Sequence, residues 1–304
     1  MIILNTLFPL FALLVLGCLL KSKGLTSDLF LKTSDKLVYY IFFPVMLFWK
    51  VVGSSTTAQS STGLCLAGIL AVGLVFIFSL IFIQKRKVIG FEAGSFSQAC
   101  FRFNTYIGMA IVLETLGQEG VRHFGILIGF LILAINVMAV SVLIWYSNQT
   151  LPLGEKAYFF LRALALNPLI LGCVGGVIVS RIQVEIPIFL NNTFALVSSV
   201  TLPLALISIG GTLSFAGLAR YKTQALAASC FKLLVLPLTG FAMLKVFGVE
   251  GVAFKTGMIF FCLPTSTALY VLSTQLNSDL ELASTAIMVS TMLSFGSLSV
   301  ALVL

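Results

Sequence analysis

Residues 101–108 read FRFNTYIG, and residues 261–268 read FCLPTSTA. Each stretch lies within a long apolar segment and brings polar or helix-breaking residues into it. A proline removes an intrahelical hydrogen bond and clashes with the preceding turn, so we expect the second segment to break at Pro264. The first stretch has no proline, and its predicted break depends on Asn104 and Thr105. The sequence therefore predicts two interrupted helices.

The composition is that of an integral membrane protein. Hydrophobic residues make up 59% of the 304 residues and charged residues only 9%, whereas about a quarter of the residues in soluble domains are charged. A helix needs roughly 20 apolar residues to cross about 30 Å of hydrocarbon, and these runs lack the alternation of β-barrel strands. We predict an all-α membrane protein with ten transmembrane helices, at residues 2–20, 37–52, 63–83, 93–116, 124–146, 157–180, 192–215, 224–247, 256–276 and 283–304.

The net charge of +8 indicates an orientation in the membrane and not a nucleic-acid partner. Basic residues of membrane proteins collect on the cytoplasmic side. One set of alternate connections has ten basic residues: Lys21, Lys23, Lys32, Lys36, Lys85, Arg86, Lys87, Lys156, Arg220 and Lys222. The other set has five: Lys50, Arg122, Arg181, Lys245 and Lys255. We expect the first side to be cytoplasmic, with both termini in the periplasm.

The two halves of the chain repeat each other. A shift of 159 residues aligns residues 9–47 with the second half at ten identities in 39 positions, and a shift of 160 pairs Thr105 with Thr265. We expect two repeats, residues 1–150 and residues 151–304, each with five spans, so that the second is inverted in the membrane. Inverted repeats with interrupted helices are typical of secondary transporters, whose sites lie near the bilayer midplane. A duplicated bundle retained for stability alone is the alternative.

Arg102 brings a fixed positive charge to the first interruption. Arginine in hydrocarbon costs roughly 2.5 to 3.5 kcal/mol on insertion scales, so it normally faces the interior of a helix bundle. Helix N-termini at the two breaks would add partial positive charge, which attracts anions. We expect an anionic ligand here; the alternative is that Arg102 caps backbone carbonyls or snorkels. The candidate binding residues at the breaks are Arg102, Asn104, Thr105, Pro264, Thr265 and Ser266.

Two further polar residues lie within apolar spans. Lys232 is well inside the eighth span, where it either lines the same cavity or snorkels to the cytoplasmic surface. Asn167 precedes Pro168 at a predicted kink and either satisfies backbone groups or contacts the ligand. We count Lys232 and Asn167 as further candidates for substrate binding.

The sequence indicates neither an enzyme nor a cofactor. Its six cysteines lie within spans and form no CxxC pair, so no metal site is predicted. An intramembrane enzyme would need an acid–base or nucleophile constellation. The chain has no HExxH motif, no paired aspartates and a single histidine.

The motifs resemble those of the auxin efflux carrier family, including its bacterial members described as malonate or malate permeases, over nearly the whole chain. The resemblance depends on LKTSDKLVYYIFFPVMLF (31–48), FRFNTYIGMAI (101–111), LNPLILG (166–172), LPLALISIGGTL (202–213) and the stretch from LPTSTALYVL to the last span (263–294). It implies two inverted five-helix repeats, crossover helices four and nine at the binding site, and a transport domain that moves like an elevator against a scaffold domain. The resemblance also implies a wider relationship to bile acid and sodium symporters.

This chain departs from the family at two places. Phe103 stands where the family often has proline, which weakens the predicted break in the fourth helix. The long loop of the plant carriers is reduced to residues 147–156, which favours a bacterial protein of the inner membrane.

Together these features predict a secondary transporter for a small organic anion, a mono- or dicarboxylate. The alternative is a sodium-coupled symporter of amphipathic organic acids, and strict sodium dependence would distinguish it. The sequence leaves open whether proton or sodium coupling exists and whether the protein forms a homodimer.

Overall fold

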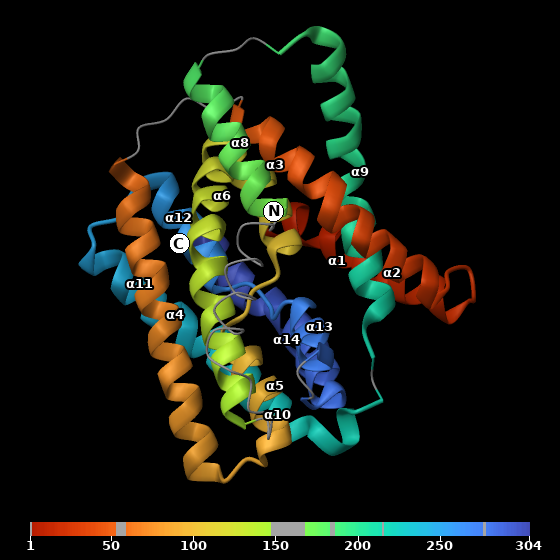
Figure 1. Ribbon diagram of the computed structural model, residues 1–304, viewed down its shortest axis with the longest axis vertical. Helices are drawn as coiled ribbons and strands as arrows, with labels where there is room; N and C mark the ends of the chain where they lie inside the picture. The colour runs from red at the N-terminus through yellow and green to blue at the C-terminus, as the bar shows by residue number, and fades with distance from the viewer. Residues whose placement is uncertain (1, 53–58, 147–167, 183–185, 215, 276–277) are drawn as a thin grey trace. The chain divides into compact units, whose positions relative to one another are not determined.

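The protein is described by a computed structural model, which covers residues 2–52, 59–146, 168–182, 186–214, 216–275 and 278–304 (Figure 1). In these residues all regular secondary structure is helical. Six helical stretches there are long and apolar enough to cross a membrane: Ile3–Ser22, Thr62–Arg86, Gly90–Leu143, Ile188–Thr212, Leu218–Val246 and Leu280–Val303. The structure therefore confirms the prediction of an all-α, multi-pass membrane protein.

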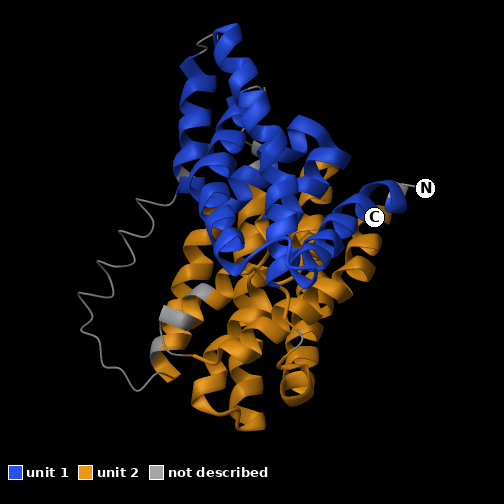
Figure 2. Cartoon of the chain, turned by 90° about the vertical axis from the view of Figure 1, so that its right-hand side faces the viewer, with its two compact units in different colours: residues 1–58, 106–129, 161–212 blue, residues 59–105, 130–160, 213–304 orange. Residues whose placement is uncertain are grey.

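The chain forms two compact units, and each draws segments from both halves of the sequence (Figure 2). Unit 1 comprises residues 1–58, 106–129 and 161–212. Unit 2 comprises residues 59–105, 130–160 and 213–304.

Unit 1 is built on close contacts between helix backbones. Its helical elements are α1 (Ile2–Ser22), α2 (Asp28–Leu37), η1 (Val38–Phe42), α3 (Phe43–Val52), α8 (Pro168–Ile182), α9 (Ile188–Thr212) and the first part of α6 (Thr105–Tyr146). Helix α1 packs on α9, and a Cβ added to Gly210 would lie 1.9 Å from the Leu14 carbonyl oxygen. Helix α3 packs on α8, where a Cβ on Gly172 would lie 2.6 Å from the Pro44 carbonyl oxygen. Small residues at such contacts let membrane helices approach closely.

The connection between α1 and α2 is fixed by local polar contacts. Ser27 caps α2, since its hydroxyl accepts a hydrogen bond from the Phe30 N–H at 3.1 Å. Lys21 Nζ lies 2.8 Å from an Asp28 carboxylate oxygen. The hydrogen bond and charge of Lys21 lower the pKa of the Asp28 carboxyl. Both side chains are exposed, so this ion pair adds little stability.

Unit 2 contains the remaining helices around an aromatic core. They are α4 (Gln59–Arg86), α5 (Gly90–Phe101), α10 (Leu218–Cys230), η2 (Phe231–Val235), α11 (Leu236–Val246), α12 (Gly251–Phe261), α13 (Ala268–Gln275), α14 (Leu280–Val303) and the last part of α6. Phe82 on α4 contacts Phe96 on α5 and Phe231 on η2, with ring centroids 5.1 and 5.6 Å apart. These aromatic contacts join α4, α5 and the helix that contains η2.

Two short π-helical turns each precede a proline. Turn η1 ends at Phe42, two residues before Pro44, and turn η2 ends at Val235, two residues before Pro237. A proline supplies no N–H to the preceding turn and clashes with it. A π turn accommodates this defect without ending the helix, and such turns are frequent at functional sites.

Helix α6 bends at Gly117, where the predicted fourth and fifth spans meet. Gly117 has φ 59° and ψ −149°, so two helices join there. A positive φ is readily adopted only by glycine.

Candidate functional site

Residues 101–108 and residues 261–268 each contain a non-helical segment. Helix α5 ends at Phe101 and α6 begins at Thr105, with Arg102 in an extended conformation between them (φ −66°, ψ 150°). Helix α12 ends at Phe261 and α13 begins at Ala268. In unit 2 the structure therefore interrupts two helices, at residues 102–104 and 262–267.

The two interruptions hydrogen-bond to each other. The Asn104 N–H donates to the Pro264 carbonyl oxygen at 2.9 Å. The Thr265 hydroxyl donates to the Ala99 carbonyl oxygen at 2.8 Å. Ala99 lies in the last turn of α5, where carbonyl groups lose their helical partners. At membrane depth such groups must be hydrogen-bonded by the protein or by water in a cavity. Each interruption here provides a hydrogen-bond donor for a backbone carbonyl group at the other interruption.

Helix α14 supports the second interruption. Ser290 Oγ accepts a hydrogen bond from the Thr265 N–H at 3.2 Å, and the Ser297 hydroxyl donates to the Cys262 carbonyl oxygen at 2.9 Å. The Ser266 hydroxyl accepts from the Ala268 N–H at 3.2 Å and so caps α13. Hydrogen bonds from α14 and the cap of α13 therefore fix the non-helical backbone of the second interruption.

Arg102 is buried and bound to neutral amides. Its side chain is 7% exposed; one guanidinium nitrogen donates to Gln98 Oε1 at 3.1 Å and another to Asn136 Oδ1 at 3.2 Å. Gln98 lies one turn earlier on α5, and its amide group donates to the Gly94 carbonyl oxygen at 3.2 Å. Neutral acceptors such as these two amide oxygens orient a guanidinium without cancelling its charge.

Lys232 lies within the π turn η2 and is 0% exposed. Its ammonium group has no hydrogen-bond partner in the described residues, and the titratable group that acts on it is Cys262, the first residue of the second interruption. The complete burial of Lys232 does not agree with snorkelling. Sequence reasoning left these two alternatives open because depth along a helix does not show which face is buried.

The other predicted binding residues differ in their burial. Pro264 is buried, whereas Thr105 and Ser266 are half-buried. Asn167 lies outside the described residues. Gln98 and Asn136, the amide partners of Arg102, are additions that the sequence analysis missed. Gln98 could have been found, since it is four residues before Arg102 on the same helix face.

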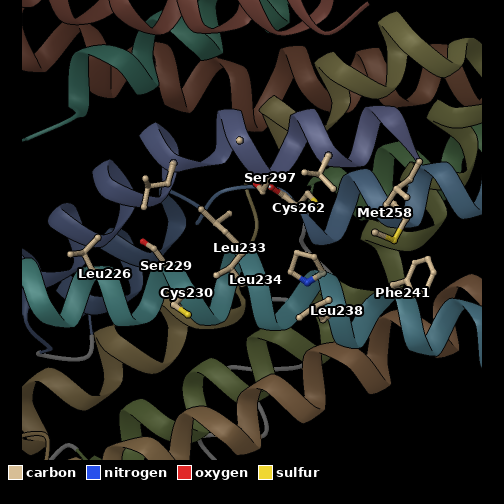
Figure 3. Close-up of a pocket in the computed structure, with 15 residues that line it drawn as sticks. Leu226, Ser229, Cys230, Leu233, Leu234, Leu238, Phe241, Met258, Cys262 and Ser297 are labelled. Atoms are coloured by element: carbon tan, nitrogen blue, oxygen red, sulfur yellow. The ribbon is translucent and has the colours of Figure 1, made fainter.

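A groove of about 720 Å³ lies in unit 2 along α10, η2 and α11, with α12 and α14 on its other side (Figure 3). Its lining is mostly apolar and includes Leu233, Leu238 and Phe241, with Cys262 and Ser297 among the few polar residues. None of the described residues predicted to bind substrate lines it. The lining of the groove therefore differs from the predicted site, although it includes Cys262, the first residue of the second interruption.

Comparisons with known proteins agree with a transport function. The sequence profile of a family described as membrane transport protein matches residues 153–302. An uncharacterized transporter of Methanocaldococcus jannaschii is 23% identical over 302 residues, which cover 97% of this chain and 96% of that protein. A protein of Rhizobium meliloti named "Putative malonate transporter" is 23% identical over 265 residues, 86% of this chain and 82% of that protein. An uncharacterized transporter of Methanothermobacter thermautotrophicus is 23% identical over 301 residues, 97% of this chain and 95% of that protein.

The apolar helices and these similarities define the class: the protein is a multi-pass membrane transporter and not an enzyme. Within that class, residues 153–302 match the membrane transport protein family, and the motifs quoted above resemble those of the auxin efflux carrier family.

Proposed function

We propose that the protein is a secondary transporter that carries a small organic anion, a mono- or dicarboxylate, across the membrane. The observation that supports this most strongly is the burial of Arg102 and Lys232 in unit 2, next to two interrupted helices. Buried cations in membrane proteins mark ligand and ion pathways. The relative named a malonate transporter is consistent with a carboxylate ligand.

In this proposal Arg102 binds the carboxylate through charge-assisted hydrogen bonds, which are stronger than neutral ones. Asn104 and the hydroxyls of Thr105, Thr265 and Ser266 surround the anion with further hydrogen-bonding groups. The N-termini of α6 and α13, which begin at the two interruptions, add partial positive charge. Asn167, which lies outside the described residues, remains a candidate from the sequence alone.

The proposed mechanism is alternating access by an elevator movement. The ten-span arrangement in two inverted repeats, with α5–α6 and α12–α13 as the crossover helices, would provide the inward-open and outward-open states. All the described candidate residues lie in unit 2. Unit 2 is accordingly our candidate for the transport domain, and unit 1, with its closely packed α1 and α9, our candidate for the scaffold. We propose the bacterial inner membrane as the location.

The test is a current measurement with purified protein on a solid-supported membrane. Malonate, malate, succinate and acetate would be applied in turn, with sodium and pH varied. We expect saturable currents for at least one carboxylate without sodium. Strict dependence on sodium would favour the alternative, a sodium-coupled symporter of amphipathic acids. Absence of current for every carboxylate, with the protein shown to be inserted, would contradict the proposal.

The variant Arg102→Gln tests the site itself. A hydrogen bond to a charged group contributes about 1.5 to 3 kcal/mol, so we expect a loss of apparent affinity of roughly 10- to 100-fold. Arg86→Gln is the matched control, because Arg86 is an exposed arginine at the end of α4 in the same unit. Equal currents from Arg102→Gln and the wild type would show that the anion binds elsewhere.

A further inference from the structure

Lys232 is buried and takes no part in the hydrogen bonds that join the two interruptions. Its ammonium group and the hydroxyl of Ser229, three residues earlier, are both buried and both without a hydrogen-bond partner in the described chain. Buried polar groups in native proteins are nearly always hydrogen-bonded. Two such groups within one turn of the same helix therefore make this place a candidate site for a ligand.

The elements around Lys232 provide it with no counter-charge. Turn η2 packs against α4, α5, α10, α11 and α14. Their titratable side chains are Cys65, Lys85 and Arg86 on α4; Glu92 and Cys100 on α5; Arg220, Tyr221, Lys222 and Cys230 on α10; Lys245 on α11; and Glu281 on α14. The two acids, Glu92 and Glu281, lie in the first turns of their helices. Among the described residues, the Cys262 thiol of the second interruption is the one titratable group that acts on Lys232.

An ammonium group without a counter-charge is costly in a protein interior, because it loses its hydration and gains no attraction in return. An anion bound nearby removes that cost. The protonated form of Lys232 and a bound anion therefore stabilise each other, and linkage requires that binding of either promotes binding of the other. Arg102 cannot act in this way, since a guanidinium stays protonated in proteins.

We propose that Lys232 takes up a proton when unit 2 binds its anion and releases it when the anion leaves, which makes the transporter an anion–proton symporter. This inference rests on the proposed function, because it needs an organic anion as the ligand. The neutral amine accepts the proton from water on the side of binding, and the ammonium returns it to water on the side of release. The carried proton offsets one negative charge of the anion, so an inside-negative membrane potential opposes uptake less.

The test is proton uptake on binding, measured with the purified full chain and malonate as the probe. Isothermal titration in two buffers of different ionisation enthalpy, at equal pH, gives the number of protons bound with each malonate. We expect net proton uptake by the wild type. We also expect the malonate dissociation constant to rise by up to about tenfold per pH unit where the lysine loses its proton. Malonate binding without proton uptake would overturn the inference and leave the proposed function intact.

Variants assign the proton to Lys232. Lys232→Arg keeps a permanent charge, so we expect it to bind malonate without proton uptake. Lys232→Met has similar volume and no charge, and we expect it to bind weakly and without proton uptake. Lys245→Met, which removes an exposed lysine of α11, should behave as the wild type.

If the arginine variant does not fold, the methionine variant and the wild-type pH dependence still decide. Proton uptake that persists in Lys232→Met would overturn the inference. A wild-type protein that binds and carries no carboxylate would instead refute the proposed function.

Discussion

Two cations of different chemistry lie in unit 2, and their surroundings suit different tasks. Arg102 is oriented by two amide oxygens, from Gln98 and Asn136. The planar guanidinium presents several donors in a fixed arrangement, so it can keep these contacts and still bind a carboxylate. Lys232 has a single nitrogen and no such contacts in the described chain. We therefore assign permanent attraction of the anion to Arg102 and the variable charge to Lys232.

The amide partner of Arg102 provides a sharp test of its role. Asn136→Asp would place a carboxylate beside the guanidinium, where it would compete with the substrate anion for the same donors. We expect the apparent affinity for malonate to fall by about tenfold, since a well-placed opposite charge contributes on the order of 1.4 kcal/mol. The matched control is Asn192→Asp, at an exposed asparagine of α9. Unchanged affinity in Asn136→Asp would show that Arg102 does not contact the anion.

The hydroxyl of Thr265 should contribute to stability and not only to binding. Thr265→Val removes the hydrogen bond to the Ala99 carbonyl oxygen and leaves that group unsatisfied within the protein. We expect a loss of about 1 to 3 kcal/mol in the free energy of unfolding. Thr265→Ser keeps the hydroxyl and should lose less. Thermal unfolding in detergent, followed by tryptophan fluorescence, measures both; equal stability of Thr265→Val and the wild type would contradict this contact.

Single residues were predictable from sequence when their chemistry alone made them unusual. An arginine and a lysine in apolar spans had to face protein or water, and both side chains are buried. Their partners were not predictable in the same way. Asn136 is 34 residues from Arg102, and its contact depends on how α6 packs in unit 2. Lys232 is buried within a π turn, and the hydropathy of the span did not predict that turn.

At the scale of helical elements, the two interruptions form one structural feature. Each exposes backbone groups that a continuous helix would satisfy, and the contacts from Asn104 to Pro264 and from Thr265 to Ala99 compensate for part of this loss. Phe103 stands where the family often has proline. Its ring packs on the ring of Phe260, with the two centroids 4.4 Å apart. An interruption without proline is therefore held by packing and by hydrogen bonds from the other interrupted helix.

The contact of α1 with α9 gives a prediction for unit 1. Gly210→Ala would place a methyl group 1.9 Å from the Leu14 carbonyl oxygen, so the two backbones must separate. Overpacking of this kind costs about 1 to 3 kcal/mol. Gly129→Ala, at a helical glycine where the added methyl group would meet open space, should be neutral or slightly stabilising. Thermal unfolding of both variants tests this, and a Gly210→Ala protein as stable as the wild type would contradict the close packing.

Hydropathy predicted where helices lie better than where they begin. The second span was predicted to start at residue 37, but α2 begins at Asp28. The residues between are DLFLKTSDKL, whose charges exclude them from an apolar run although their spacing is helical. Ser27 was the available signal, since serine before an acidic first turn is typical of a helix N-cap. The π turns had no sequence signal beyond the prolines that follow them.

At the scale of the whole molecule, the distribution of basic residues predicts the orientation. Ten basic residues lie on the same side of the membrane as the connection after the first span, so this side should be cytoplasmic. Both ends of the chain should then face the periplasm. We expect a C-terminal alkaline phosphatase fusion to be active and a C-terminal green fluorescent protein fusion to be dark in a bacterial host. Fusions after Lys87 should give the opposite result. A fluorescent C-terminal fusion would contradict the predicted topology.

The two compact units do not coincide with the two predicted repeats, residues 1–150 and 151–304. Each unit takes segments from both halves of the chain. Figure 2 shows the two units in different colours. A repeat predicted from sequence concerns similarity between two segments of the chain, whereas a compact unit describes which helices pack together. The division into one unit with the buried cations and one with closely packed glycines is what our elevator proposal needs, and it could not be derived from the repeat alone.

The central claim is that unit 2 carries an organic anion bound at Arg102. The most direct measurement is counterflow of radiolabelled malonate into proteoliposomes preloaded with unlabelled malonate, with no imposed potential or ion gradient. We predict transient accumulation of label by the wild type and by Arg86→Gln, and strongly reduced accumulation by Arg102→Gln that inserts equally well. Equal accumulation by Arg102→Gln and the wild type would contradict the claim.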